Sequence, residues 1–334
     1  MIQTVVYSFH DLLPYVNWIY FFHAWGIAPR FVHIADVHDC PACRRAWVES
    51  MGENDRSQAV EAEKLHREAV ALVRELDGQY AVSARFGLFP AYSEGDDVIV
   101  LVPETENDEN IKQKGKCTEK EVRLPFLRQQ KMQHPEEAFL CLADFIAPRG
   151  TYPHLLEDFP DFPRDEAQPR GTALGMFATA VDGRMEQLFP DDDYRRMLVQ
   201  TLADRMAEAA AEKMHEDIRR IYWGYSPLEK YTPKELFAEK YEGRRPAVGY
   251  PSIPDQSMNF LIDDLVGMKA IGIELTSNGM MQPHAAVSGF IFDHPAARHF
   301  AVGPIDEEQC LDYSARRGLP EKEMRKYLAA NLKV

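Results

Sequence analysis

The chain has 334 residues, of which 45% are hydrophobic and 27% are charged, and its net charge is −15. This composition is typical of a folded globular protein, and so acidic a surface repels phosphate backbones, so nucleic acid is not an expected partner. The five unevenly spaced cysteines suit a reducing compartment better than a disulfide framework, and we expect a cytoplasmic protein.

The chain begins with an apolar stretch that is rich in aromatic residues. It carries His10, Asp11 and Asn17 and has no basic region before it, which argues against both a signal peptide and a membrane-spanning helix. Apolar residues recur at spacings of three and four over residues 11–25, and this spacing predicts a helix with one buried face.

The next segments predict a helix and then a change to strands. Residues 57–77 predict an amphipathic helix with Ser57 as its N-cap. The hydrophobic period then becomes two, and residues 87–104 predict a pair of strands around a turn at 94–96. Residues 104–121 are polar and charged, which predicts a loop.

The central part of the chain alternates short apolar runs with one long helix. Residues 139–148 and 175–181 predict buried strands. Between them, residues 150–171 contain several prolines and aspartates, which predicts an exposed connection. The strongest helix pattern spans residues 191–222, where three aspartates at the start complement the helix dipole.

The C-terminal part predicts further helices and one pair of strands. The expected helices span residues 232–241, 257–267, 306–317 and 321–331. The expected antiparallel strands span residues 287–295 and 299–305. Because the strands come in hairpin-like pairs, the pattern favours an α+β fold with an antiparallel sheet over a doubly wound fold.

The first candidate for a ligand site is the loop Arg245-Pro-Ala-Val-Gly-Tyr-Pro251, since nucleotide-binding and common hydrolase motifs are absent. Its prolines and glycines fix an irregular path and admit a ligand close to the backbone. Arg245 could make a bidentate bond to a carboxylate, and Tyr250 offers a flat face to an aromatic ring. The alternative is a structural connection with Arg245 in an internal ion pair.

A second candidate lies on the predicted long helix, where Asp204, Glu208 and His215 fall near one face. Glu208 could bind an amino group or a ribose hydroxyl. The alternative is an ordinary solvated face of the helix.

A third candidate combines two histidines with a C-x-x-C pair, and its members are His33, His38, Cys40 and Cys43. This composition is that of a zinc site, although the spacing matches no standard zinc motif. A redox pair and reduced structural thiols remain as alternatives.

Several motifs together carry a resemblance to a known family. They are Gly87–Ala91, Gly95–Asp97, Leu127–Gln130, Cys141–Phe145, Ala203–Glu208, His215–Glu216, Ile221–Tyr225, Arg245–Pro251, Val287–Phe290 and Phe300–Val302. They closely resemble the C-terminal activation (reactivation) domain of cobalamin-dependent methionine synthase, over nearly the whole chain. The resemblance implies one C-shaped α+β domain over residues 1–334, with a twisted antiparallel sheet flanked by helices. Residues 33–56 are then an insertion and 150–171 a long loop.

The resemblance also implies a function in methionine biosynthesis. A module of this family binds S-adenosylmethionine and docks over a separate cobalamin domain. Flavodoxin or a similar reductase supplies an electron to inactive cob(II)alamin, and S-adenosylmethionine supplies the methyl group. The modules for homocysteine, methyltetrahydrofolate and cobalamin are not in this sequence. We therefore expect action in trans and no complete catalytic site in this chain.

The resemblance places the S-adenosylmethionine pocket at Asn17, Glu208, Arg245, Ala247, Gly249, Tyr250, Ile291 and Phe292. It assigns the methionyl carboxylate to Arg245 and the adenine side to Ile291 and Phe292. The family has an aspartate in place of Asn17 and a tyrosine in place of Ile291, and both changes should weaken binding. The alternative function is therefore a docking protein for a cobalamin protein that has lost S-adenosylmethionine binding.

Overall fold

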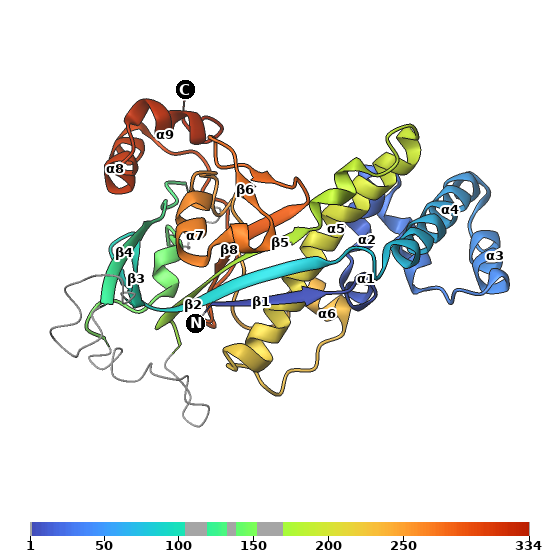
Figure 1. Cartoon of the computed structure of the whole chain (residues 1–334), viewed down its shortest axis with the longest axis horizontal. Helices are drawn as coiled ribbons and strands as arrows, with labels where there is room; N and C mark the ends of the chain where they lie inside the picture. Colours follow the sequence, from blue (N-terminus) through green and yellow to red (C-terminus); the bar gives the residue numbers. More distant parts are fainter. Residues whose placement is uncertain (1, 104–118, 132–137, 152–169, 334) are drawn as a thin grey trace.

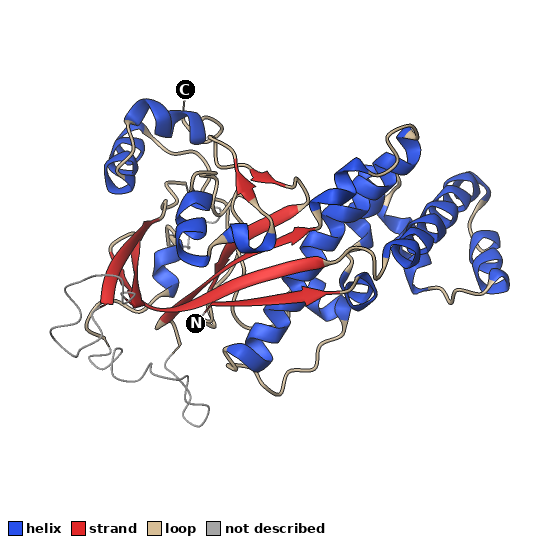
Figure 2. Ribbon diagram, viewed as in Figure 1, coloured by secondary structure: helices blue, strands red, loops and turns tan. Residues whose placement is uncertain are grey.

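A twisted antiparallel sheet runs along the middle of an elongated molecule and has helices on both faces (Figures 1 and 2). The structure is a computed structural model, and it describes residues 2–103, 119–131, 138–151 and 170–333. The strand order is β4-β3-β2-β5-β8, and β1 pairs with β2. The strands are β1 (Ile2–Tyr7), β2 (Val82–Glu94), β3 (Asp97–Pro103), β4 (Glu119–Pro125), β5 (Ala173–Val181) and β8 (Ala286–Ile291), and a separate hairpin joins β6 (Glu274–Leu275) to β7 (Met281–Gln282).

Strand β2 joins the two parts of the sheet, because it is long enough to pair with β5 along its first residues and with β3 along its last. Its first nine residues pair with β5, from Val82 opposite Val181 to Pro90 opposite Ala173. Its last residues pair instead with β3 across a turn at Gly95, which has a φ of +64°. The predicted pair of strands and its turn are confirmed, and β2 begins five residues earlier than expected.

Strand β5 is buried on both faces, which explains its sequence, apolar except for Thr179. Phe177 belongs to the core on one side, together with α5 (Asp193–Asp217). Met176 and Ala178 belong to the core on the other side, together with α7 (Met258–Val266). The predicted strand at 175–181 is thus confirmed, and it lies between the two hydrophobic cores.

The helices fall into two groups on opposite faces of the sheet (Figure 1). Helix α5 packs on β2, β5 and β8, and α1 (Phe9–Leu12), α2 (Trp18–Ala24) and α4 (Glu53–Leu76) contact it. Helix α3 (Pro41–Glu49) packs on α4, on the side away from α5 (Figure 1). Helix α7 packs on the other face, and the chain closes with α8 (Glu307–Arg317) and α9 (Glu321–Tyr327). No helix within the described ranges is both long and apolar enough to cross a membrane.

The predicted long helices are confirmed, with shifted ends. Helix α4 begins four residues before Ser57, because Gly52 is its N-cap and acidic Glu53 and Asp55 occupy the first turn. Helix α5 is capped by Asp192, whose side chain accepts the Arg195 N–H at 3.0 Å. The helix then continues as a π-helical turn over Ile218–Tyr222, so the predicted end at residue 222 is confirmed.

Three predicted elements are wrong. The helix expected at 11–25 is broken by Pro14 into α1, a 3-10 turn (Leu13–Tyr15) and α2, since proline lacks the N–H that an interior turn needs. The strand expected at 139–148 is a 3-10 turn (Leu142–Phe145). The expected pairing of 287–295 with 299–305 does not form, because β8 pairs with β5.

Other predictions are met in part. The loop expected at 104–121 ends early, because Glu119–Pro125 forms β4; residues 104–118 and 152–169 lie outside the described residues. The helix expected at 232–241 is α6 (Pro233–Phe237), with Thr232 and Glu235 as a capping box. The three remaining C-terminal helices are confirmed as α7, α8 and α9.

The carboxyl group of Asp293, just after β8, should give the protein a pH-dependent stability. Asp293 is 2% exposed and accepts the Gly171 N–H at 2.8 Å. Burial raises the pKa of Asp293 to about 6, against an ordinary 3.8. Because the folded pKa is raised, this carboxyl stabilises the fold when protonated, and its contribution is lost as the pH rises through about 6.

We therefore expect Asp293→Asn, which keeps the acceptor oxygen but cannot ionise, to gain stability relative to the wild type as the pH rises. The difference in unfolding free energy should change by on the order of 3 kcal/mol between about pH 4 and pH 7.5. Urea unfolding of both proteins at several pH values measures this. If the difference in unfolding free energy between the two proteins does not vary with pH, the pKa of Asp293 is not raised in the folded protein.

Candidate functional site

A cavity of about 620 Å³ lies between α5, the loop at residues 245–252 and the N-terminal segment around Asn17. Its volume is in the range of pockets for small molecules. Helix α5 contributes Arg205, Glu208 and Glu212, which its turns place on one side. The cavity is thus walled by the predicted ligand loop and by the longest helix.

The loop is held beside β8 as a short additional strand. The Val248 N–H donates to Ser288 O at 2.9 Å, and the Phe290 N–H donates to Pro246 O at 3.0 Å. Ala247 therefore lies opposite Gly289 as a non-hydrogen-bonded pair, so its own N–H and C=O point away from β8.

Gly289 makes this close approach possible. A Cβ at that position would clash with the Pro246 carbonyl oxygen and would lie 2.8 Å from the Ala247 Cα. The sequence needs glycine here because loop backbone occupies the space that a side chain would fill.

A tight turn follows and directs Tyr250 outward. Gly249 has a φ of +86°, and its N–H donates to Ile253 O at 2.8 Å. The turn is fixed from the other side, where the Val302 N–H donates to Pro251 O at 2.9 Å. Tyr250 is 52% exposed, so its ring forms part of the cavity and also part of the surface.

Arg245 forms an ion pair with Glu212 inside the cavity wall. The Nη2 atom of Arg245 lies 3.1 Å from Oε2 of Glu212, and each side chain is 12% exposed. Burial raises the pKa of Glu212, and the charge of Arg245 opposes that effect. The pair leaves Nε of Arg245 and Oε1 of Glu212 buried without a hydrogen-bond partner. Buried polar atoms are nearly always paired, so this pair has capacity for further bonds.

Glu208 and Tyr250 join the two walls of the cavity. The Tyr250 hydroxyl donates to Oε1 of Glu208 at 2.6 Å. Burial and the nearby Glu208 raise the pKa of Tyr250, so the hydroxyl stays protonated and remains a donor. Asn17 also lines the cavity, while its Oδ1 accepts the Ile19 N–H at 3.2 Å as the N-cap of α2.

The structure brings five of the eight expected pocket residues to this cavity: Asn17, Glu208, Arg245, Ala247 and Tyr250. Gly249 shapes the turn and is not a lining residue. Ile291 and Phe292 are fully buried and do not line the cavity. Ile291 packs opposite Gly175 of β5, and the Phe292 ring packs on Phe126 at 6.4 Å between centroids.

The second candidate from the sequence is not assembled as expected. Asp204 turns to a separate cavity of about 360 Å³, where its Oδ1 lies 3.5 Å from Nδ1 of His284. His215 is fully buried, and burial holds its pKa well below the usual value. Only Glu208 of that set lines the cavity beside Arg245.

Sequence reasoning missed Glu212 as a partner of Arg245. The available signal was its position one helical turn after Glu208, which places both carboxylates on the same side of α5. The internal ion pair that the sequence offers as the alternative for Arg245 is present, and the partner residue, Glu212, lines the same cavity.

These features define an α+β domain with a small-molecule cavity beside a buried arginine–glutamate pair. The family model for the vitamin B12 dependent methionine synthase activation domain matches residues 8–318 of the chain. A solved structure of the MetH reactivation domain bound to AdoHcy (S-adenosylhomocysteine) is 31% identical, with a TM-score of 0.77, and the match covers 100% of this chain and 91% of that chain. The chain belongs to the family of vitamin B12 dependent methionine synthase activation domains, as its motifs indicate.

Proposed function

We propose that this chain binds S-adenosylmethionine in the cavity beside Arg245 and supports the reductive remethylation of inactive cob(II)alamin in methionine synthase. Family membership supports the role, and the similar MetH domain is bound to AdoHcy, the product that remains when S-adenosylmethionine has lost its methyl group. The partners that we propose are the cobalamin-binding modules of a methionine synthase and flavodoxin or a similar reductase, in the cytoplasm.

The observation that carries the proposal is the incompletely satisfied pair of Arg245 and Glu212. The methionyl part of S-adenosylmethionine is a zwitterion, with a carboxylate and an ammonium on the same carbon. A guanidinium beside a carboxylate is complementary to both charges. A small reorientation of the pair lets Arg245 bind the ligand carboxylate while Glu212 accepts from the ammonium.

The remaining expected residues have compatible roles in this pose. The outward N–H of Ala247 is available to the adenosyl part, while its C=O already accepts the Tyr250 N–H at 3.4 Å. Tyr250 provides a ring at the rim, and Gly249 keeps the turn that positions it. When bound, S-adenosylmethionine supplies the methyl group; the residues of this chain bind it and orient it toward the partner.

The experiment combines the chain with a cobalamin-loaded methionine synthase fragment that lacks its own activation domain. With a reductase and S-adenosylmethionine labelled in the methyl group, we expect label to appear on the cobalamin. The alternative of a docking protein without ligand binding, suggested by Asn17 in place of an aspartate, predicts a stable complex but no transfer of label. That result would sink the proposed function.

A further inference from the structure

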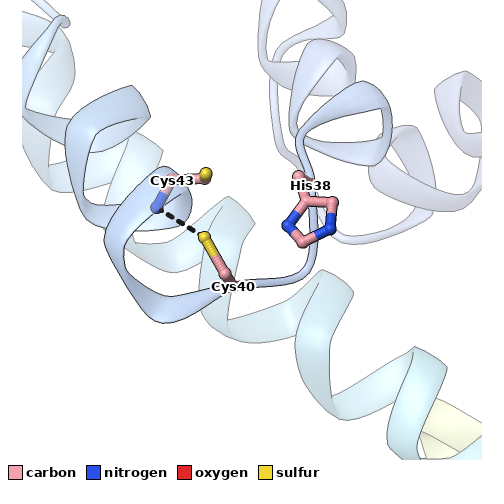
Figure 3. Close-up of side chains that lie close together, drawn as sticks. All are labelled: His38, Cys40 and Cys43. Atoms are coloured by element: carbon pink, nitrogen blue, oxygen red, sulfur yellow. Dashed lines mark hydrogen bonds between the residues drawn. The ribbon is translucent and has the colours of Figure 1, made fainter.

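A second cluster of reactive side chains lies outside the lining of the cavity, in the segment between the 3-10 stretch Pro29–Asp36 and α3. Ligand atoms of His38, Cys40 and Cys43 all lie within 4.8 Å of one another (Figure 3). His33, which the sequence groups with them, is not in this cluster; its Nδ1 lies 3.6 Å from a carboxylate oxygen of Asp36.

The start of α3 brings the two thiols together. Cys40 is the N-cap of the helix, and its Sγ accepts the Cys43 N–H at 3.2 Å, drawn as the dashed line in Figure 3. Cys43 is the third residue of the helix, so its side chain lies on the turn that Cys40 caps. Both sulfurs therefore lie at one helix end, where the positive end of the helix dipole favours thiolates.

The turn that carries His38 is anchored to the helices around it. Asp39, between His38 and Cys40, accepts from Nε of Arg44 at 3.0 Å and from Nη2 of Arg74 on α4 at 2.9 Å. Arg44 is 5% exposed, so this anchor is buried at its Arg44 end, while the side chains of Asp39 and Arg74 are exposed. The three candidate ligands are thus presented by a fixed turn, and His38 and Cys43 are open to solvent.

We propose that His38, Cys40 and Cys43 bind a zinc ion. Thiolate sulfur and imidazole nitrogen are the ligands that zinc prefers, and a tetrahedral site needs sulfur atoms about 3.8 Å apart, which follows from Zn–S bonds of about 2.3 Å. The three ligand atoms already lie close to such an arrangement. No fourth His, Cys, Asp or Glu joins them among the residues that the structure describes, so water or an added ligand takes the fourth position.

The proton balance of this site is simple. Binding releases one proton from each thiol, and two thiolates with a neutral imidazole cancel the charge of Zn²⁺. A disulfide between the cysteines is the competing use of the same atoms, but it would give His38 no role.

The test measures zinc binding by the full chain, reduced and freed of metal, in competition with a chromogenic chelator. We expect one zinc per chain. Cys40→Ser and Cys43→Ser should each lose at least about 100-fold in affinity, and His38→Ala at least about 10-fold. His33→Ala is the matched control, five residues away and outside the cluster, and should bind as the wild type does. Cobalt substitution should give a thiolate-to-cobalt absorption band that the cysteine variants lack.

Two results would overturn the zinc site. The first is equal zinc binding by the wild type and a Cys40→Ser/Cys43→Ser protein whose circular dichroism and thermal unfolding are unchanged. The second is a reduced protein that takes up no zinc but forms a disulfide between the two cysteines with a mild oxidant, which would assign them to redox chemistry. Neither result depends on the S-adenosylmethionine pocket, so this inference can fail while the proposed function stands.

Discussion

Replacing Arg245 with alanine should weaken S-adenosylmethionine binding by about 100-fold or more, because a charge-assisted bidentate bond to the methionyl carboxylate is lost. The change also leaves Glu212 buried without its cation. Breaking such a buried pair costs roughly 3–5 kcal/mol of stability, so the variant should unfold at a lower temperature. Calorimetric titration below that temperature measures the loss of affinity in the folded protein.

Two further variants separate binding from stability. Arg245→Lys keeps a positive charge beside Glu212 but loses the planar fork, so we expect a folded protein with affinity reduced by about 10-fold. Arg317→Ala removes another buried arginine, whose Nε lies 3.4 Å from Asp255 and which does not line the cavity. It should be destabilised yet bind S-adenosylmethionine normally. Unchanged affinity in folded Arg245→Ala would show that the loop is only a structural connection.

Gly289→Ala should dislodge the ligand loop from β8. The added Cβ meets the backbone at Pro246 and Ala247, which cannot move aside as a flexible side chain could. The loop must shift, and the hydrogen bonds from Val248 to Ser288 and from Phe290 to Pro246 are strained or lost. We expect a loss of about 3 kcal/mol in unfolding free energy from overpacking and lost hydrogen bonds, and ligand affinity lower by at least about 10-fold.

Denaturant unfolding and ligand titration of the purified variant measure both effects. Gly183→Ala is the matched control, because the nearest atom to its added Cβ is the Pro283 Cβ at 3.6 Å, an ordinary contact. It should change stability by less than about 0.5 kcal/mol. If Gly289→Ala behaves like this control, the loop is not held against β8 as the structure has it.

The sequence predicts best those elements whose local pattern and burial agree. Helix α5 has an acidic start and a cap, and β5 is an apolar run, and both are found where expected. Strand β4 is missed because Glu119–Pro125 is mostly charged, as suits the edge position it occupies. The 299–305 segment has the composition of a strand, but its Val302 N–H bonds to the ligand loop, a tertiary contact that no local pattern encodes.

The candidate site is predicted only in part for a similar reason. Family motifs lead to Arg245, Glu208 and Tyr250, because these lie in continuous runs of the sequence. Glu212 is recognised as the partner of Arg245 only from the packing of α5 against the loop, which brings together residues distant in the sequence. Ile291 belongs to the core on the α5 side of the sheet, and which face of β8 it occupies depends on pairing with β5.

Calorimetric titration of the wild-type chain with S-adenosylmethionine tests the central claim most directly. We predict saturable heat with one ligand per chain, abolished when AdoHcy already fills the cavity. The absence of heat up to millimolar ligand, from a protein that unfolds cooperatively, would contradict a binding site beside Arg245.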